Sequence, residues 1–267
     1  MFGRAELNPG RSRSGALILA GLALSFGAAT AQADEPDGWR VELGGERAGV
    51  ALGGGDLTWW SGQAALGWRR ANHGGAQVSV EPQRRGTAND VALVAQGYRF
   101  LGRWTIAGQA GVTPHADFYY RSALEAEVAR NLGHGLVVHT AWRRLDFPTA
   151  RADLLIPSLT WYTARGDIQT RVFLGHNKTH DTSSHAVLLR GNWQAWPLVR
   201  LQAAAAVGQR LFDVTSLTRD PQQGWIVAAG ARFSLSRRQW IGVDLRRAHE
   251  NPSFDQTSLA VSMGRSF

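Results

Sequence analysis

Charged residues two positions apart recur in this sequence, and they are the first candidates for binding chemistry. Glu125 and Glu127 form one such pair, and Asp244 and Arg246 form another. Residues i and i+2 of an extended strand point to the same face, so each pair would present two charges on one side. Carboxylates and guanidinium groups held in this way can bind polar groups through charge-assisted hydrogen bonds.

Nucleophilic and metal chemistry has weaker support in the sequence. His139 and His176 fall within expected strands, but His139 should face an interior and His176 has no obvious serine neighbour with which to build an acyl-active site. His180, Asp181 and His185 could face a metal, although a polar loop is the favoured interpretation. No nucleotide-binding, zinc-protease or serine-hydrolase motif is present. We therefore predict no catalytic residue, no metal site and no cofactor, so a non-enzymatic protein.

The N-terminal residues have the pattern of a secretory signal. Arginines at positions 4, 11 and 13 precede an apolar run, and Ala31 and Ala33 provide a small-x-small cleavage site. The run is shorter than the roughly 20 residues of a spanning helix, which disfavours the alternative of a membrane anchor. We expect a cleaved signal peptide over residues 1–33 and a mature domain over residues 34–267.

Composition indicates which partners an exported chain would meet. The formal charge of +8 falls to +6 once the three arginines and one glutamate of the signal are removed, and Lys178 is the only lysine. Such a basic protein outside the cytoplasm meets anionic lipid, lipopolysaccharide or acidic polysaccharide rather than nucleic acid. Cysteine is absent, so no disulfide can form.

Two-residue alternation between turn signals predicts a series of long strands after residue 38. The expected strands are 39–47, 57–70, 76–85, 89–100, 103–113, 119–131, 135–145, 151–163, 167–176, 184–196, 199–211, 223–235, 239–248 and 256–267. Their lengths suit membrane-crossing strands of about 9 to 11 residues. We therefore predict an all-β, up-and-down antiparallel transmembrane barrel of about fourteen strands. Twelve strands remain the alternative if the segments before Ala76 form a plug or an edge hairpin.

Connections and aromatic residues agree with this register. Connections alternate between short and longer polar ones, as periplasmic turns and external loops do in outer-membrane barrels, and both termini fall on the periplasmic side. Aromatic residues gather at the strand ends, which predicts two interfacial girdles rather than the buried tryptophans of a soluble sandwich. The periplasmic group is Trp39, Trp68, Tyr98, Phe100, Trp104, Trp161, Trp193, Trp196, Trp240 and Phe267. The outer group is Trp59, Trp60, Tyr119, Tyr120, Trp142, Phe147, Phe212, Trp225 and Phe254.

Alternation also sorts side chains between lipid and lumen. In the last strand Val261 should face lipid and Ser262 the interior, and the terminal aromatic Phe267 is expected to be the signal that the barrel-assembly machinery reads. The candidate lumen residues are Glu125, Glu127, His139, Arg143, Arg171, Arg190, Arg232, Asp244 and Arg246. They would either line a substrate path or pair with one another and rigidify a closed barrel.

The central region resembles the YaiO family of outer-membrane barrels. The resemblance rests on the Thr113-Pro114 loop with Phe118, the Glu125-x-Glu127 strand, the "WRR" strand at Trp142 and the "PSLTWYTARGDIQTRVFL" hairpin, and it covers about residues 60–267. "FYYRS" after the loop departs from the family pattern, in which a second proline is expected. The resemblance implies a bacterial outer-membrane location and a link to polysaccharide-synthesis machinery.

Together these patterns predict a conduit or accessory for export of a polar substrate such as an exopolysaccharide. The alternative is a narrow or plugged barrel that acts as a surface interaction or assembly module. An outer-membrane lipid acyl hydrolase or transferase is a third, less favoured hypothesis.

Overall fold

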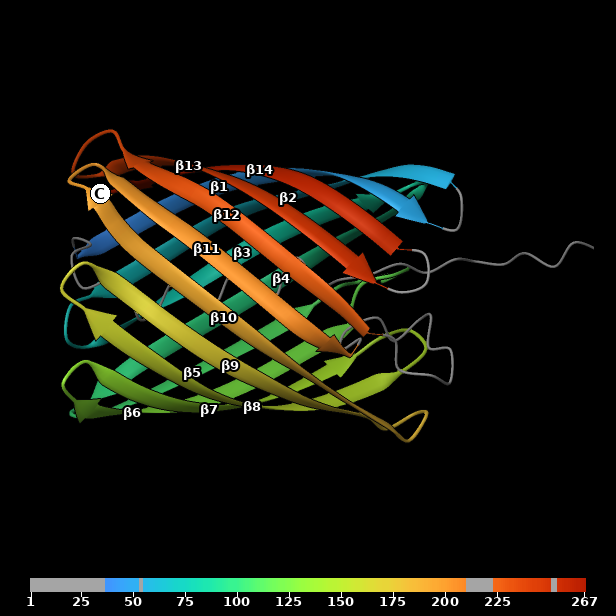
Figure 1. Ribbon diagram of the computed structural model, residues 1–267, viewed down its shortest axis with the longest axis horizontal. Helices are drawn as coiled ribbons and strands as arrows, with labels where there is room; N and C mark the ends of the chain where they lie inside the picture. The colour runs from blue at the N-terminus through green and yellow to red at the C-terminus, as the bar shows by residue number, and fades with distance from the viewer. Residues whose placement is uncertain (1–36, 53–54, 210–222, 251–253) are drawn as a thin grey trace, which may run out of the picture.

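The protein is a single closed β-barrel. The computed structural model describes residues 37–52, 55–209, 223–250 and 254–267, so the predicted signal peptide and Phe212 lie outside the described residues. The antiparallel strands run obliquely around a common axis (Figure 1). Within the described ranges, no helix is long and apolar enough to cross a membrane.

Fourteen strands form the wall, and β1 pairs with β14 to close it. The strands are β1 (Gly38–Leu52), β2 (Gly55–Arg70), β3 (Gly74–Arg85), β4 (Ala88–Leu101), β5 (Trp104–Val112), β6 (Ser122–Gly133), β7 (Leu136–Asp146), β8 (Arg151–Thr163), β9 (Gly166–Asn177), β10 (Thr182–Trp196), β11 (Val199–Gln209), β12 (Gln223–Ser234), β13 (Gln239–Glu250) and β14 (Phe254–Ser266). The prediction of fourteen strands is confirmed. The alternative of twelve is wrong, because the residues before Ala76 belong to wall strands β1 and β2 and to the start of β3.

Two strand boundaries differ from the prediction more than the others do. The β1–β2 ladder continues to the pair Leu52 and Gly55, so most of the expected first loop is strand. Strand β6 begins at Ser122 rather than at residue 119, and both Tyr119 and Tyr120 are only 1% exposed. Consecutive residues of a strand point to opposite faces, so two adjacent buried tyrosines require the chain to leave the strand.

The outer face of the barrel is apolar, as expected for a lipid-facing surface. Val261 is 46% exposed on β14, whereas Ser262 turns inward. The alternation assigned from the sequence is therefore confirmed for the closing strand. The same apolar outward face recurs on the remaining strands, with Leu93, Leu155, Leu189 and Leu245 among its exposed members.

The two ends of the barrel differ in their connections. The end at which β14 finishes carries the C-terminus (Figure 1), and its connections are short turns between β2 and β3, β4 and β5, β6 and β7, β8 and β9, β10 and β11, and β12 and β13. The opposite end carries the longer connections 113–121 and 210–222. Outer-membrane barrels have short periplasmic turns, so we assign the C-terminal end to the periplasm.

The predicted aromatic girdles are only partly correct. Trp60, Trp142 and Trp225 are exposed on the outer half, and Trp39, Trp68, Trp104, Trp161, Trp193, Trp196 and Phe267 are exposed near the periplasm. Other members of the predicted girdles are lumen-facing or buried: Trp59, Tyr119, Tyr120, Phe147 and Phe254 are buried, and Tyr98, Phe100 and Trp240 lie on the lumen face of their strands. The position of an aromatic residue at a strand end does not reveal whether its ring faces lipid or the lumen. The rings that are buried or face the lumen occupy part of the barrel interior.

Candidate functional site in the barrel lumen

All of the predicted lumen residues lie on the inward face of their strands. Glu125 and Glu127 come from β6, His139 and Arg143 from β7, Arg171 from β9 and Arg190 from β10, while Arg232, Asp244 and Arg246 come from β12 and β13. The structure therefore places them in one lumen. Their role in a substrate path stays a prediction.

The most buried charge pair joins Glu125 and Arg143. These residues are direct cross-strand partners on β6 and β7, and Arg143 Nε donates a hydrogen bond to Glu125 Oε2. Both side chains are 3% exposed. Removing one partner of such a pair leaves an uncompensated buried charge, so the pair fixes the local structure of the lumen.

On the periplasmic side of this pair, a series of hydrogen bonds connects inward-facing side chains of the strands from β6 to β9. His139 Nδ1 lies 3.0 Å from Glu127 Oε1, and its Nε2 lies 3.2 Å from Thr160 Oγ1. Gln169 Nε2 donates to Thr160 Oγ1 over 3.0 Å, and Arg171 Nε donates to Gln169 Oε1 over 3.1 Å. The predicted residues Glu127, His139 and Arg171 are thus members of one polar layer.

Two further predicted charges, Arg246 and Asp244, also have identified partners. Arg246 Nη1 lies 3.2 Å from Glu46 Oε1 on β1, so this contact spans the closing strand β14. Gln202 Nε2 donates to the carboxylate of Asp244. The first contact bridges the β1–β14 seam, and the second joins β11 to β13 across β12.

An inward-folded segment that the sequence analysis did not identify lies in the outer half of the lumen. Residues 113–121 connect β5 to β6, and Tyr119 and Tyr120 stack inside the barrel with ring centroids 4.2 Å apart. Around them lie Leu145, Leu154, Ile156 and Phe173 with other buried apolar side chains. We call residues 113–121 the inner segment.

Asp90 on β4 holds the inner segment in place. Its Oδ1 accepts a hydrogen bond from Asp117 N over 2.9 Å, and its Oδ2 accepts from Phe118 N and Tyr119 N over 3.0 and 2.7 Å. Asp90 itself is 2% exposed. Three backbone N–H groups thus donate to one buried carboxylate, so the buried donors and the buried acceptor are all paired.

Burial also determines the charge state of the two tyrosines. Their removal from water raises the pKa of both hydroxyl groups, because burial disfavours the phenolate. The inner segment therefore contributes neutral aromatic groups to the lumen, whereas the layer below it is charged.

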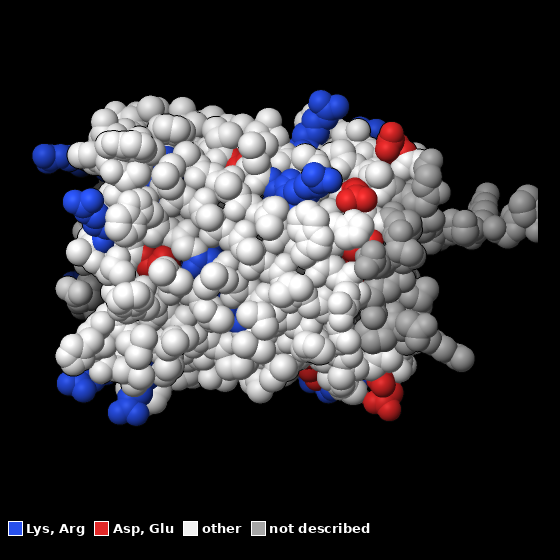
Figure 2. Space-filling model, in the orientation of Figure 1, with Lys and Arg blue, Asp and Glu red and all other residues white. Residues whose placement is uncertain are grey.

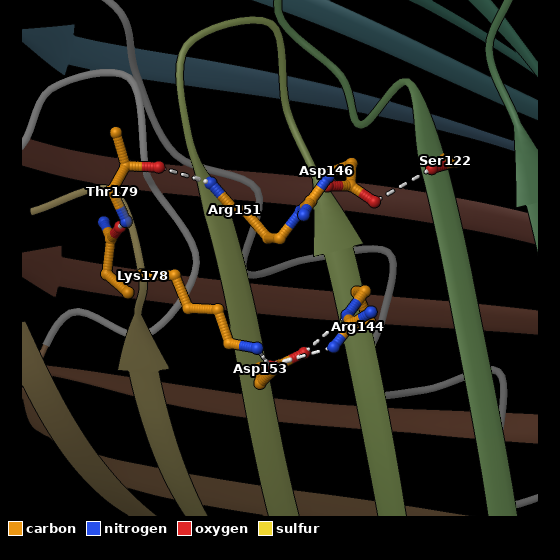
Figure 3. A network of polar contacts seen from close by, with 8 residues as sticks. Ser122, Arg144, Asp146, Arg151, Asp153, Lys178 and Thr179 are labelled. Atoms are coloured by element: carbon orange, nitrogen blue, oxygen red, sulfur yellow. Dashed lines mark hydrogen bonds and ion pairs between the residues drawn. The ribbon is translucent and has the colours of Figure 1, made fainter. Parts of the chain in front are cut away.

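Outward-facing residues form a separate polar network at the outer rim (Figure 3). Arg144 Nε and Lys178 Nζ lie 2.8 and 2.6 Å from the carboxylate of Asp153. Arg151 binds Asp146, which also accepts a hydrogen bond from Ser122 Oγ over 3.2 Å. These contacts tie β6, β7, β8 and the residues after β9 together above the lipid-facing surface.

The structure corrects one statement about His176. Ser183 is its direct cross-strand partner on β10, and Ser183 Oγ lies 3.5 Å from His176 Nδ1, so a serine neighbour does exist. Asp181 Oδ1 is 3.8 Å from His176 Nε2, but its side chain is 96% exposed. An exposed carboxylate at that distance gives the imidazole little orientation. The described residues also contain no group of three or more His, Cys, Asp or Glu that could hold a metal ion.

Comparison with known families agrees with this architecture. Residues 52–202 match the YaiO membrane beta barrel domain. The chain belongs to the YaiO family. The barrel therefore resides in the bacterial outer membrane, and the predicted family and location are confirmed. No curated protein sequence matches the chain.

Solved structures share the fold of this YaiO protein at low sequence identity. The CymD monoaromatic hydrocarbon channel has a TM-score of 0.61 at 8% identity, over 86% of this chain and 89% of the other. A bacterial polysaccharide outer membrane secretin has a TM-score of 0.58 at 12% identity, over 86% and 99%. Omp33 of Acinetobacter baumannii has a TM-score of 0.53 at 13% identity, over 88% and 100%. These similarities establish an outer-membrane barrel fold.

Proposed function

We propose that this YaiO protein is a gated outer-membrane conduit, which receives a polar substrate from the periplasm and is closed by its inner segment in the present state. The observation that carries the proposal is the change in lumen chemistry along the barrel. A charged layer around Glu127, His139 and Arg171 gives way to an apolar layer around Tyr119 and Tyr120.

The form of the closure supports a gate rather than a permanent core. The inner segment is a connection between two strands, so it can move without breaking the wall ladder. Its attachment to the wall includes three hydrogen bonds to the single residue Asp90. Lids and loops of this kind open without loss of the scaffold.

The expected substrate is a carbohydrate polymer, as the resemblance to the family implies. Arginines and carboxylates in a wet lumen can bind sugar hydroxyls, and charges on facing walls orient a hydrated chain. A polysaccharide-synthesis partner in the periplasm would supply that polymer.

Planar-bilayer conductance of the refolded mature chain tests the proposal. The wild type should show little or no current, and Asp90→Ala should open the lumen because it releases the backbone of the inner segment. The matched control is Asp146→Asn, which removes a rim carboxylate near the same connection but outside the lumen. Current that appears in Asp90→Ala and stays absent in the control supports a gate.

The alternative function is a closed barrel that serves as a surface interaction or assembly module. The interior pairs Glu125–Arg143 and Arg246–Glu46 favour it, because paired charges rigidify a barrel without binding anything else. Absence of current from both wild type and a folded Asp90→Ala variant would refute the conduit and leave this function in its place.

A further inference from the structure

Two arginines face each other at the periplasmic mouth of the lumen. Arg200 on β11 and Arg232 on β12 are direct cross-strand partners on the inward face. Like charges directly opposite one another destabilise a sheet. An anion bound beside both groups would relieve this repulsion, so the arrangement is typical of an anion-binding site.

Neighbouring polar and aromatic groups hold these guanidinium groups. Arg200 Nε donates to Gln194 Oε1 over 3.2 Å, and the Arg232 guanidinium carbon lies 3.7 Å from the centre of the Trp240 ring. The cross-strand partner of Arg232 on β13 is Gly242, and the next inward-facing residue of β13 is the acidic Asp244. The Asp244 carboxylate accepts a hydrogen bond from Gln202. Both arginines are partly exposed to the lumen.

Trp240 adds an aromatic surface beside the two arginines. A Cβ atom at Gly264 would lie 2.4 Å from Trp240 Nε1, and one at Gly242 would lie 3.4 Å from Trp240 Cζ3. The two glycines therefore leave the space in which the indole lies along the inner wall. The Arg232 guanidinium lies over the other face of the ring, 3.7 Å from its centre, so the indole orients this arginine through a cation–π contact.

Further basic side chains lie at the periplasmic mouth, where Glu42 and Asp167 are lumen-facing acidic residues. Arg69 on β2 faces the lumen at the same end, and its Nε and Nη1 atoms are buried without a hydrogen-bond partner. Buried polar groups are normally paired, so these atoms are further candidates to receive a ligand oxygen. Arg40 lies on the neighbouring strand β1, where it contacts Glu42 and Gln77.

Arginines also surround the mouth on the outside. They are Arg70, Arg99, Arg103, Arg130, Arg165, Arg237, Arg238 and Arg265, while Asp37 is an acidic residue described there. Basic side chains project from this end on the face shown in Figure 2, whereas both basic and acidic side chains project toward the opposite end. A rim in which one sign predominates raises the local concentration of ligands of opposite charge around the opening.

We propose that Arg200, Arg232 and Trp240 form a binding site for an acidic saccharide, in which the arginines bind carboxylates and the indole holds the Arg232 guanidinium in place. The inference rests on the proposed function because it names the substrate class of that conduit. A lipid headgroup is disfavoured as the ligand because these side chains face the lumen. The pairs Arg130–Trp104 and Arg265–Phe267 are at the same end on the outward face, where membrane phosphates are available.

The site can be tested by calorimetric titration of the refolded mature barrel with an alginate oligosaccharide, which is a chain of uronic acids. Arg200→Gln and Arg232→Gln should each weaken binding roughly tenfold, since each removes one charge-assisted contact. Trp240→Phe should weaken it less. The matched control is Arg265→Gln, which removes an arginine beside an aromatic ring at the same end but on the lipid-facing side, and it should bind as the wild type does. Heat-modifiable migration on a gel verifies that each variant is folded.

Comparison ligands define which results overturn the site. Neutral maltohexaose should bind at least tenfold more weakly than alginate if carboxylates are recognised. Equal binding of oligoglutamate, which has charge but no sugar ring, would refute an acidic saccharide as the ligand class. Loss of binding in Arg265→Gln with retention in the lumen variants would assign the ligand to the outward rim instead.

The result is separable from the gate experiment. Alginate binding that depends on Arg200 and Arg232 in a barrel that never conducts would refute the conduit and keep the site. Conductance in Asp90→Ala without any alginate binding would keep the conduit and refute the site.

Discussion

Tyr119 donates its backbone N–H to the carboxylate of Asp90 over 2.7 Å, and both residues are almost completely buried inside the barrel. Asp90 belongs to the wall and Tyr119 to the inner segment, so this contact joins the wall to the proposed gate. A buried carboxylate that accepts backbone donors is a strong attachment, because either side left unpaired is costly.

We first predict that Asp90→Ala loosens the inner segment without unfolding the wall. The substitution leaves the amides of residues 117–119 without their acceptor, at an expected cost of roughly 3 kcal/mol or more. Limited trypsin digestion of the refolded protein should then cut more rapidly after Arg121, which follows the segment. Asp146→Asn is the control and should be cut at the wild-type rate. Equal rates for all three proteins would contradict the role of Asp90.

The second prediction concerns the buried pair of Glu125 and Arg143. Glu125→Gln or Arg143→Met should each lower the free energy of unfolding by about 3 to 5 kcal/mol, because the remaining charge stays buried without its partner. The double variant should recover part of the loss. Urea unfolding followed by tryptophan fluorescence measures these changes.

The control for that experiment is the rim pair of Arg144 and Asp153, whose side chains are 36% and 17% exposed. Asp153→Asn should cost about 1 kcal/mol or less, since solvent screens this interaction. If the two single substitutions in the lumen were strictly additive in the double variant, the inner pair would not be coupled as its geometry indicates.

A third prediction tests the faces of the closing strand. Val261→Arg places a charge in the lipid-facing band and should cost roughly 2 to 4 kcal/mol, whereas Ser262→Arg should be much milder because its side chain enters the lumen. Heat-modifiable migration reports the folded fraction of each variant. Equal damage from the two substitutions would show that the assignment of faces is wrong.

The wall was predictable from sequence because its physics is periodic. In β14, apolar Leu259, Val261 and Met263 alternate with small residues, and the same period sets their cross-strand pairing. Membrane strands are also long, so the number and register of the strands follow from the sum of many repeated signals.

The inner segment was not predictable in the same way. Tyr119 and Tyr120 looked like members of an interfacial girdle, because aromatic residues at a strand end have the same sequence signal whether they face lipid or fold inward. Their anchor, Asp90, lies 29 residues away from Tyr119 in the chain. A lone aspartate in an alternating strand carries no local signal for such a contact. The Arg200–Arg232 pair likewise becomes visible only when the register of β11 and β12 is known.

The last prediction separates the recognition of Phe267 from its contribution to stability. The Phe267 amide donates to the Trp39 carbonyl over 2.9 Å, but the residue itself is 56% exposed and lies beside the Arg265 guanidinium. Phe267→Ala keeps the backbone hydrogen bond and removes a ring that is not part of the core. Refolding of the purified variant in detergent should therefore match the wild type.

Assembly in cells should be slower if the barrel-assembly machinery reads the terminal aromatic. Pulse-chase labelling with heat-modifiable migration would measure the rate of assembly. The conservative variant Phe267→Tyr should restore assembly. Equal loss in both assays would mean that the ring acts through stability, and equal retention in both would mean that Phe267 is not the assembly signal.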